Sequence, residues 1–165
     1  MAVTSSLELR TGVRPGDIGA IARLHGLEYS EHYGLDERFE AMVARGLARF
    51  VLALAEDPEA GRAWLAEDAE GLAGCIAISR EGEAHGRVRW FLVAERARSQ
   101  GLGRRLLDEA LAYARERFSS LELDTFSELT TAAGMYRAAG FELASATPYS
   151  EWGREIQLQR YELRF

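Results

Sequence analysis

The stretch Val93-Ala-Glu-Arg-Ala-Arg98-Ser-Gln-Gly101-Leu-Gly103-Arg-Arg-Leu-Leu107 joins a strand pattern to a helix pattern and decides the fold. Gly101 and Gly103 lack a Cβ, so a ligand can approach the backbone closely there. A helix that begins at this point presents unpaired N–H groups and the positive end of its dipole. The stretch therefore predicts an anion site, most simply for phosphate or pyrophosphate, and a tight turn without a ligand is the alternative. Three arginines add positive charge around it: Arg98, Arg104 and Arg105.

The segments on either side of this turn predict an α/β chain. Val88–Val93 reads as a buried strand, a helix follows the turn to about Phe118, and Leu121–Thr125 returns as a strand. Strand, helix and strand in succession predict a parallel crossover. The expected helical pair comprises a helix from Asp17 to about His32 and a second from about Asp36, closed by a loop at Asp57–Gly61. The other expected elements are a strand at about 5–11, a hairpin of Ala63–Glu67 and Leu72–Ser79, a short helix before Gly140, and strands at Phe141–Ala146 and Glu155–Leu163.

Three local features complete this prediction. Asp17 and Ser127 are residue types that favour helix N-caps, and both are expected to cap the helices that follow them. Gly140 fits the position just after a helix end. In the last strand the apolar residues change phase midway, which predicts a bulge near Gln159–Arg160.

Length and composition place limits on the class of protein. The chain has 165 residues, 47% of them hydrophobic, which predicts one domain over residues 1–165 with a real core. The formal net charge of −6 argues against a broad nucleic-acid interface. No apolar segment has the length of a membrane span or the form of a signal peptide. We therefore expect a cytoplasmic protein with no nucleic-acid or membrane partner.

The types of side chain present exclude some catalytic mechanisms. All 20 basic residues are arginine, which excludes a Schiff-base lysine and a lysine base. Cys75 is the only cysteine and lies in an apolar run, so it is expected to be a buried thiol in a reducing compartment. The histidines His25, His32 and His85 do not have metal-ligand spacing, and no metal site is expected.

Two motifs give the chain a family resemblance. Arg98-Ser-Gln-Gly101-Leu-Gly103 matches R/Q-x-x-G-x-G/A, the acetyl-CoA signature of the GNAT acyltransferase superfamily. Ala132-Ala-Gly-Met-Tyr136-Arg-Ala-Ala-Gly140-Phe141 looks like the later motif A-x-x-x-Y-x-x-x-G-F, and the order of segments is also similar. The resemblance implies an α/β domain with a mixed, mostly antiparallel central sheet of about six to seven strands, flanked by about four helices.

A narrower resemblance covers roughly residues 20–165. It is to the GNAT domains often fused behind MarR-type DNA-binding domains. It rests on His25-x-x-x-Tyr29, Tyr33-Gly34, Phe39-Glu40, the strand Val88–Val93, and the ending Gln159-Arg-Tyr-Glu-Leu163. No helix-turn-helix segment precedes these residues, so DNA binding is not carried over.

The resemblance implies acetyl-CoA as co-substrate and no metal. Backbone N–H groups of residues 98–104 would hold the pyrophosphate, and the strand ending at Leu92 and Val93 would pair with the pantetheine arm. An N–H group near Val93 would polarise the thioester carbonyl. The implied cofactor-binding residues are Leu92, Val93, Arg98, Ser99, Gln100, Gly101, Leu102, Gly103 and Arg104.

Tyr136 is the general acid that the resemblance implies for the leaving thiolate, and core packing is its alternative role. The implied function is an acetyl-CoA-dependent N-acetyltransferase that acts on a small-molecule or peptide amine by direct attack in a ternary complex. The alternative is a non-catalytic acyl-CoA-binding or sensor module. A dinucleotide-binding domain would need a third glycine where Leu106 stands, and that interpretation fails.

Two residues depart from the family pattern. Ser99 stands where the wider family often has glycine, but its backbone N–H is still available to a phosphate. Leu129 stands where an asparagine is often found, seven residues before the catalytic tyrosine. This second change removes one polar contact expected near the pantetheine arm.

The acceptor side is less determined. The helical pair is expected to wall the acceptor pocket, and the substrate-binding residues expected around it are Tyr29, His32, Tyr33, Glu40 and Arg89. The acceptor, the acyl-chain preference and the oligomeric state stay open, although a homodimer through the C-terminal strands is an available arrangement. The general base is also open, and each of its candidates has a solvated or structural role as the alternative: Glu28, Glu31, His32 and Glu40.

Three further side chains have alternative interpretations. His25 lies on the apolar stripe of its helix and is expected to be a packed core histidine. Arg89 either points into the acceptor cleft and binds a carboxylate or is a solvated strand residue. Trp152 either lines the pocket or covers an edge of the sheet.

Overall fold

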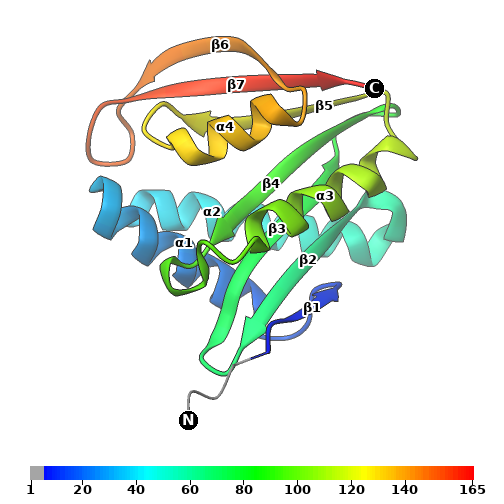
Figure 1. Ribbon diagram of the computed structural model, residues 1–165, viewed down its shortest axis with the longest axis horizontal. Helices are drawn as coiled ribbons and strands as arrows, with labels where there is room; N and C mark the ends of the chain where they lie inside the picture. Colours follow the sequence, from blue (N-terminus) through cyan, green and yellow to red (C-terminus); the bar gives the residue numbers. More distant parts are fainter. Residues whose placement is uncertain (1–5) are drawn as a thin grey trace.

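A seven-stranded sheet forms the centre of the computed structural model, which describes residues 6–165 (Figure 1). The strand order is β1-β2-β3-β4-β5-β7-β6, and every neighbouring pair is antiparallel except β4 and β5. The strands are β1 (Glu8–Thr11), β2 (Gly61–Asp68), β3 (Gly71–Arg80), β4 (His85–Val93), β5 (Ser120–Phe126), β6 (Glu142–Tyr149) and β7 (Ile156–Arg164). The helices within the described residues are α1 (Asp17–Tyr33), α2 (Glu37–Glu56), α3 (Leu102–Arg115) and α4 (Thr130–Ala138), with short 3₁₀ turns η1 (Pro58–Ala60) and η2 (Glu95–Ala97).

This architecture confirms the expected α/β fold class and the parallel crossover from β4 through α3 to β5. The element boundaries differ in places from the prediction. Helix α2 ends at Glu56, directly before the expected loop Asp57–Gly61, whereas α3 ends at Arg115 rather than at about Phe118. The first strand was expected from about residue 5, which lies outside the described residues, and β1 begins at Glu8.

Helices cover both faces of the sheet, so the protein has two hydrophobic cores. Helices α3 and α4 pack on the near face in Figure 1, and α1 and α2 on the other. Leu106 and Leu111 of α3 belong to the first core, while Val43 and Leu47 of α2 belong to the second. All four side chains are less than 5% exposed, and Val43 and Leu47 lie one helical turn apart.

Strands β4 and β5 stay paired only at the end where both begin. Their parallel register joins His85–Arg87 to Ser120–Glu122 and includes no later residue. Beyond this point the two strands diverge, while β4 continues to pair with β3 and β5 with β7. The β5-facing edge of residues 88–93 is therefore left without a strand partner among residues 6–165.

A β-bulge lies on β4 where the two strands separate. Leu92 is opposite Cys75 and Arg89 is opposite Ala77, so β4 holds one more residue than β3 between these pairs. Trp90 in the bulge has a φ of 48°, which is unusual for a bulky residue.

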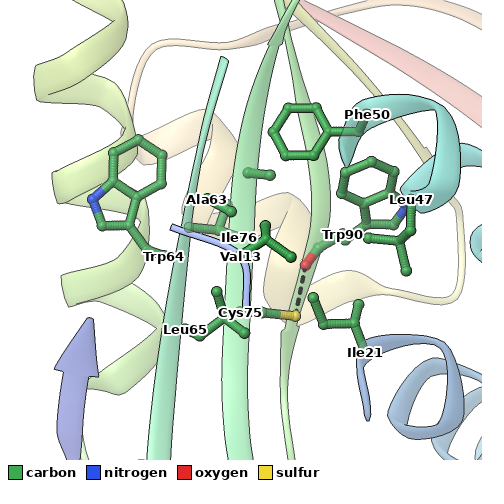
Figure 2. A pocket seen from close by; sticks show the side chains of 11 residues that line it. Val13, Ile21, Leu47, Phe50, Ala63, Trp64, Leu65, Cys75, Ile76 and Trp90 are labelled. Carbon is green, nitrogen blue, oxygen red and sulfur yellow. Dashed lines mark hydrogen bonds between the residues drawn. The ribbon is translucent and has the colours of Figure 1, made fainter. Parts of the chain in front are cut away.

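Neighbouring residues hold this strained backbone in place. The thiol of Cys75 donates a hydrogen bond to the Trp90 carbonyl oxygen at 3.1 Å, as Figure 2 shows. Burial raises the pKa of Cys75 to about 12, so the thiol keeps its proton. The Trp90 ring packs edge-on against Phe50 of α2 and lies close to Gly46 on the same helix. Cys75 is thus a buried thiol, as expected, with a hydrogen bond that the sequence did not indicate.

A buried ionic cluster ties the N-terminal strand to the rest of the fold. The Arg10 guanidinium donates to the Asp17 carboxylate at 2.7 and 3.0 Å and to Glu67 of β2 at 2.9 Å. Asp17 was expected to be an N-cap, and this prediction is wrong. Gly16, with a φ of 95°, occupies the N-cap position, and Asp17 accepts hydrogen bonds from Arg10 and from the Arg14 N–H.

Two other local predictions are also wrong. Ser127 does not cap α4, because its backbone N–H continues the β5–β7 pairing by donating to Gln157, and the helix begins at Thr130. The register of β7 against β5 runs without interruption through residues 159–160, so β7 has no bulge there. The apolar phase changes because Ile156 packs in the α1/α2 core while Tyr161 packs in the α3/α4 core. The bulge is on β6, between Leu143 and Ser145.

None of the helices within residues 6–165 has both the length and the apolar character needed to cross a membrane.

Candidate active site

The divergence of β4 and β5 opens a cleft of about 920 Å³ through the middle of the sheet. One part lies beside the turn that precedes α3 and beside α4, and we call it the donor half. The other part lies beside α1, α2 and the β6–β7 connection, and we call it the acceptor half. Donor-half lining residues include Leu92, Val93, Ser99, Gly101, Gly103, Thr125, Met135 and Tyr136. Acceptor-half lining residues include Tyr29, Tyr33, Phe39, Met42, Arg87, Arg89, Asp124, Phe126, Glu128, Tyr149 and Trp152.

The turn before α3 is shaped by two left-handed residues. Ser99 has a φ of 62° and Gly101 a φ of 76°. Within residues 6–165, no acceptor in the protein is bonded to the backbone N–H groups of residues 99–104, and the first N–H with a helical partner is that of Arg105, bonded to Gly101. Unpaired N–H groups at a helix N-terminus form an anion-binding surface. The observed turn therefore has the geometry that the glycine pattern predicts.

The arginines of this turn are placed differently from one another. Arg98 donates to the Val93 carbonyl at 3.2 Å and to the Glu28 carboxylate at 2.9 Å, which joins the turn to α1. The other Glu28 oxygen accepts from the Glu95 N–H at 3.1 Å. The Arg104 side chain is 72% exposed and lies 3.4 Å from Asp108, so it remains free to move. All of the residues expected to bind the cofactor line the cleft except Gln100.

Gly103 keeps the donor half open. A Cβ at this position would lie 3.5–3.6 Å from the Met135, Val93 and Phe91 side chains, which is ordinary van der Waals contact. All three of these residues line the cleft. A longer side chain at 103 would therefore occupy the space between α3 and α4.

Tyr136 lies in the donor half, about thirty residues after the turn in sequence. It is 5% exposed, and its ring lies near those of Phe91, Phe141 and Tyr161, with centroids 5.8–6.1 Å apart. Within residues 6–165 its hydroxyl makes no hydrogen bond, although the residue lines the cleft. Burial raises the pKa of Tyr136, so the phenol keeps its proton at neutral pH. The side chain is thus both packed in the core and available to a bound molecule as a proton donor.

Thr125 of β5 carries a buried hydroxyl without a partner. The residue is 6% exposed and lines the cleft, and its Oγ1 has no hydrogen bond in the described part of the chain. Leaving a buried hydroxyl unsatisfied costs about 1–3 kcal/mol.

We expect Thr125→Val to stabilise the free protein by about 1 kcal/mol, because valine keeps the shape and removes the unsatisfied hydroxyl. Urea unfolding measures the change, with Thr147→Val on the exposed strand β6 as the matched control. A loss of stability in Thr125→Val would show that the hydroxyl has a partner.

The acceptor half receives three of the five residues expected there. Tyr29, Tyr33 and Arg89 line the cleft, whereas His32 and Glu40 do not. His32 lies between Glu28 and Glu95, at 3.5 and 3.4 Å, and Glu40 lies against Gly26 in the contact between α1 and α2. None of the four candidate bases, Glu28, Glu31, His32 and Glu40, is among the residues that line the cleft.

His25 and Trp152 also line the cleft. The His25 ring is 3% exposed, and its Nδ1 lies 2.8 Å from the Ile21 carbonyl oxygen. Burial lowers the pKa of His25 to about 4, so the ring is neutral at neutral pH. Trp152 packs against Tyr149 and Phe39 and forms part of the wall.

Asp124, Phe126, Glu128 and Tyr149 line the acceptor half and were not singled out from the sequence. The alternation in Leu121–Thr125 carries a signal for one of them, because it places Asp124 on the face opposite the buried leucines. No comparable signal exists for Glu128, in the turn after β5, or for Tyr149, at the end of β6.

Within residues 6–165 no group of three or more histidine, cysteine, aspartate or glutamate side chains is arranged to hold a metal ion.

Residues 21–141 match the model of a family described as the acetyltransferase (GNAT) family. The chain is also similar to the solved structure of a ribosomal-protein-alanine N-acetyltransferase from Brucella melitensis, with 18% identity, a TM-score of 0.73, and coverage of 96% of this chain and 99% of that one. A spermidine N-acetyltransferase from Vibrio cholerae, solved in complex with CoA and spermine, gives 21% identity, a TM-score of 0.68, and coverage of 96% and 95%. An acetyltransferase from Streptococcus agalactiae 2603 gives 19% identity, a TM-score of 0.74, and coverage of 96% and 98%. At these identities the solved structures show a shared fold.

Proposed function

Because the chain belongs to the acetyltransferase (GNAT) family, we propose that its cleft binds acetyl-CoA and that the protein transfers the acetyl group to an amine. The observation that carries this proposal is the row of unpaired N–H groups at residues 99–104 beside the open edge of β4. The acceptor nitrogen would bond to the thioester carbonyl carbon of acetyl-CoA and lose one proton to solvent, while the carbon–sulfur bond breaks and the sulfur takes up a proton to leave as the CoA thiol. The related spermidine N-acetyltransferase, which was solved with CoA bound, supports the choice of cofactor.

The donor half fits this co-substrate. The N–H groups of residues 99–104 and the α3 dipole suit a pyrophosphate. The unpaired edge of residues 88–93 suits the amides of a pantetheine arm, which would add to the sheet as a further strand does. Gly103 leaves the space between α3 and α4 free for such an arm. We therefore assign cofactor binding to this turn and to the end of β4, including Leu92 and Val93.

Tyr136 has the chemistry to complete the reaction. Its phenol is protonated at neutral pH and lines the donor half, so we assign it the proton that the departing sulfur takes up. We assign the polarisation of the acetyl carbonyl to a backbone N–H near Val93, because the edge of β4 is open there. Holding the amine and the thioester together in one cleft supplies the orientation that direct transfer needs.

CoA binding by a Gly103→Val variant tests the donor site. When the CoA concentration is 100 times its dissociation constant, we expect the wild-type protein to gain about 2.7 kcal/mol of stability. This gain corresponds to a rise of roughly 5–10 °C in Tm. The valine methyl groups would fill the space next to Met135, Val93 and Phe91, so the dissociation constant should rise at least about tenfold.

Gly134→Ala is the matched control for this test. Gly134 is exposed on α4, and an added Cβ would meet nothing within 4 Å. We expect this variant to bind CoA as the wild type does. Equal CoA binding by Gly103→Val and wild type, or no shift of the wild-type Tm at millimolar CoA, would contradict the proposed donor site.

A further inference from the structure

The acceptor half of the cleft is walled by aromatic rings from five separate segments. They come from α1, α2, β5, β6 and the β6–β7 connection, and all belong to the α1/α2 core: Tyr29, Tyr33, Phe39, Phe126, Tyr149 and Trp152. Neighbouring centroids lie 4.6–5.8 Å apart, which makes the wall continuous. Three of the rings are fully packed, while Tyr33, Tyr149 and Trp152 are only partly buried and present surface to the cleft.

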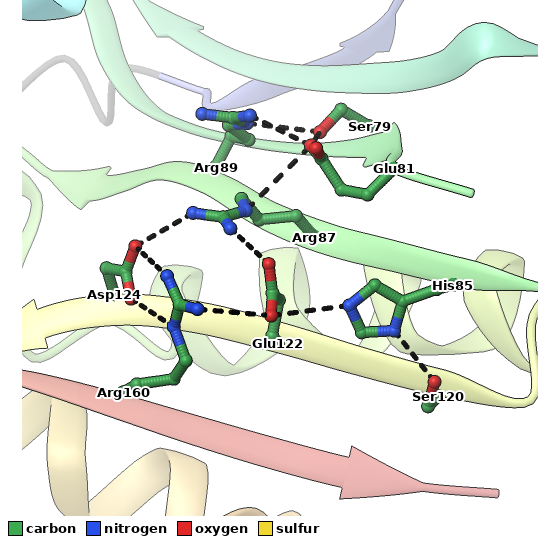
Figure 3. A network of polar contacts seen from close by, with 9 residues as sticks. All are labelled: Ser79, Glu81, His85, Arg87, Arg89, Ser120, Glu122, Asp124 and Arg160. Atoms are coloured by element: carbon green, nitrogen blue, oxygen red, sulfur yellow. Dashed lines mark hydrogen bonds and ion pairs between the residues drawn. The ribbon is translucent and has the colours of Figure 1, made fainter. Parts of the chain in front are cut away.

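Ion pairs occupy the polar floor next to this wall. Figure 3 shows the guanidiniums of Arg87, Arg89 and Arg160 alternating with carboxylates on the same face of the sheet. Arg87 lies 2.8 Å from Asp124, and Arg160 lies 2.9 Å from the same carboxylate. Arg89 lies 2.8 Å from Glu81.

The carboxylates of this floor are held by the arginines beside them. Glu122 pairs with both Arg87 and Arg160. Burial alone would raise the pKa of Asp124, but hydrogen bonds from Arg160 and Arg87 and their charges hold it below the ordinary value. His85 bonds Ser120 at 2.7 Å and faces Glu122 at the closed end of the two strands.

The charges on this side of the cleft balance. Asp124 and Glu128 are the only carboxylate residues among the described residues that line it, and Glu128 is bound by both terminal nitrogens of Arg154 at 2.8 and 2.9 Å. Counting the floor and this pair together, four arginines face four carboxylates, and every member has a partner within 4 Å. Every carboxylate and every guanidinium of this set therefore already has an oppositely charged partner, although the buried Nε of Arg87 makes no hydrogen bond within the described residues.

This balance separates three classes of amine. A polyamine carries several positive charges and needs several unpaired carboxylates to replace their hydration. An amino acid carries a carboxylate and needs an unpaired guanidinium. A monoamine on an aromatic body needs neither, because its ring packs on aromatic faces and its ammonium is attracted to them before it loses its proton.

On this basis, and resting on the proposed transferase function, we propose that the acceptor is a primary monoamine borne on an aromatic body and lacking a carboxylate. The rings of Tyr33, Tyr149 and Trp152 form the surface on which the aromatic body packs. The paired arginines and carboxylates of the floor select against acceptors with additional charge.

The test compares three amines in an assay that follows CoA thiol release from acetyl-CoA. The probes are 2-phenylethylamine, L-phenylalanine, which adds a carboxylate to the same skeleton, and spermidine, which replaces the ring with further charges. We expect kcat/KM for 2-phenylethylamine to exceed that for each of the others at least about tenfold. Equal or higher kcat/KM with spermidine or L-phenylalanine overturns the acceptor class and leaves the transferase function intact.

Two variants test whether the aromatic wall binds the amine. Trp152→Ala and the more conservative Tyr33→Leu should each raise the KM for 2-phenylethylamine at least about fivefold without changing the KM for acetyl-CoA. Leu52→Ala, at a 69% exposed position of α2 outside the cleft, should change neither. An unchanged amine KM in both ring variants overturns the inference. No thiol release with any amine, despite normal CoA binding, overturns the proposed function and the acceptor class together.

Discussion

Replacing Tyr136 with phenylalanine is expected to lower kcat by roughly 100-fold or more, because a positioned general acid contributes about 10²–10⁴-fold to a rate. The variant removes one hydroxyl that has no hydrogen bond within residues 6–165, while the ring and its packing against Phe91 and Phe141 stay. Stability and the KM for acetyl-CoA should therefore change little. Steady-state kinetics together with thermal unfolding separate these effects.

Tyr161→Phe is the matched control for Tyr136→Phe. Tyr161 is fully buried, with its ring centroid 6.1 Å from that of Tyr136, but it does not line the cleft. Its hydroxyl oxygen accepts a hydrogen bond from Arg137 at 3.0 Å. This variant should lose some stability and keep its kcat. If Tyr136→Phe keeps the wild-type kcat, the phenol has only a packing role.

The second large effect is on stability. Arg10→Met should lower the free energy of unfolding by about 3 kcal/mol, since removing one partner leaves the buried carboxylate of Asp17 without its counter-charge. For a chain of this length the Tm should fall by roughly 6–12 °C. Arg38→Met removes the exposed pair with Asp36 and should leave the Tm nearly unchanged, because solvent screens that pair.

The pH dependence of stability identifies the cause of this loss. Burial acts to raise the pKa of Asp17, but the hydrogen bonds from Arg10 and the Arg14 N–H outweigh it and hold the pKa below 3.8. A carboxyl whose pKa is depressed by folding stabilises the protein above its ordinary pKa, and this contribution disappears as the pH falls through the lower, folded value. The stability difference between wild type and Arg10→Met should therefore shrink below about pH 4. Parallel pH profiles would show that the loss comes from packing rather than from the ion pair.

The donor half was largely predictable because its determinants are local. Gly101 and Gly103 lie in one short stretch. The spacing of the apolar residues before and after them predicts the strand that precedes the turn and the helix that follows it. The position of Tyr136 beside this turn could not be predicted from local sequence. No spacing rule brings residues thirty positions apart together, and that expectation came from the family resemblance.

The acceptor half was harder to predict because it depends on helix phase and on tertiary contacts. His25, Tyr29 and Tyr33 follow each other at four-residue spacing, so they share the face of α1 that meets the cleft. His32 is one residue out of this phase and turns to Glu95 instead. Glu40 fills the space left by Gly26 on the neighbouring helix, which no pattern within α2 could reveal.

One prediction was wrong because residues of a single strand pack on opposite faces of the sheet. In β7 the apolar phase changes because Ile156 and Tyr161 belong to different cores, although periodicity alone makes the same change look like a bulge. The true bulge that shapes the site, at Trp90, gives no signal, because residues 90–93 are all apolar and show no change of phase.

The most direct test of the proposed function is the stoichiometry of acetyl transfer. The protein is incubated with acetyl-CoA and a panel of aromatic amines, amino acids and polyamines. Mass spectrometry quantifies the N-acetylated product, and thiol release quantifies free CoA. We predict equal amounts of N-acetylated amine and CoA with at least one amine, and loss of both in Tyr136→Phe. Tight CoA binding without an N-acetylated product from any amine would contradict the function and leave a module that only binds acyl-CoA.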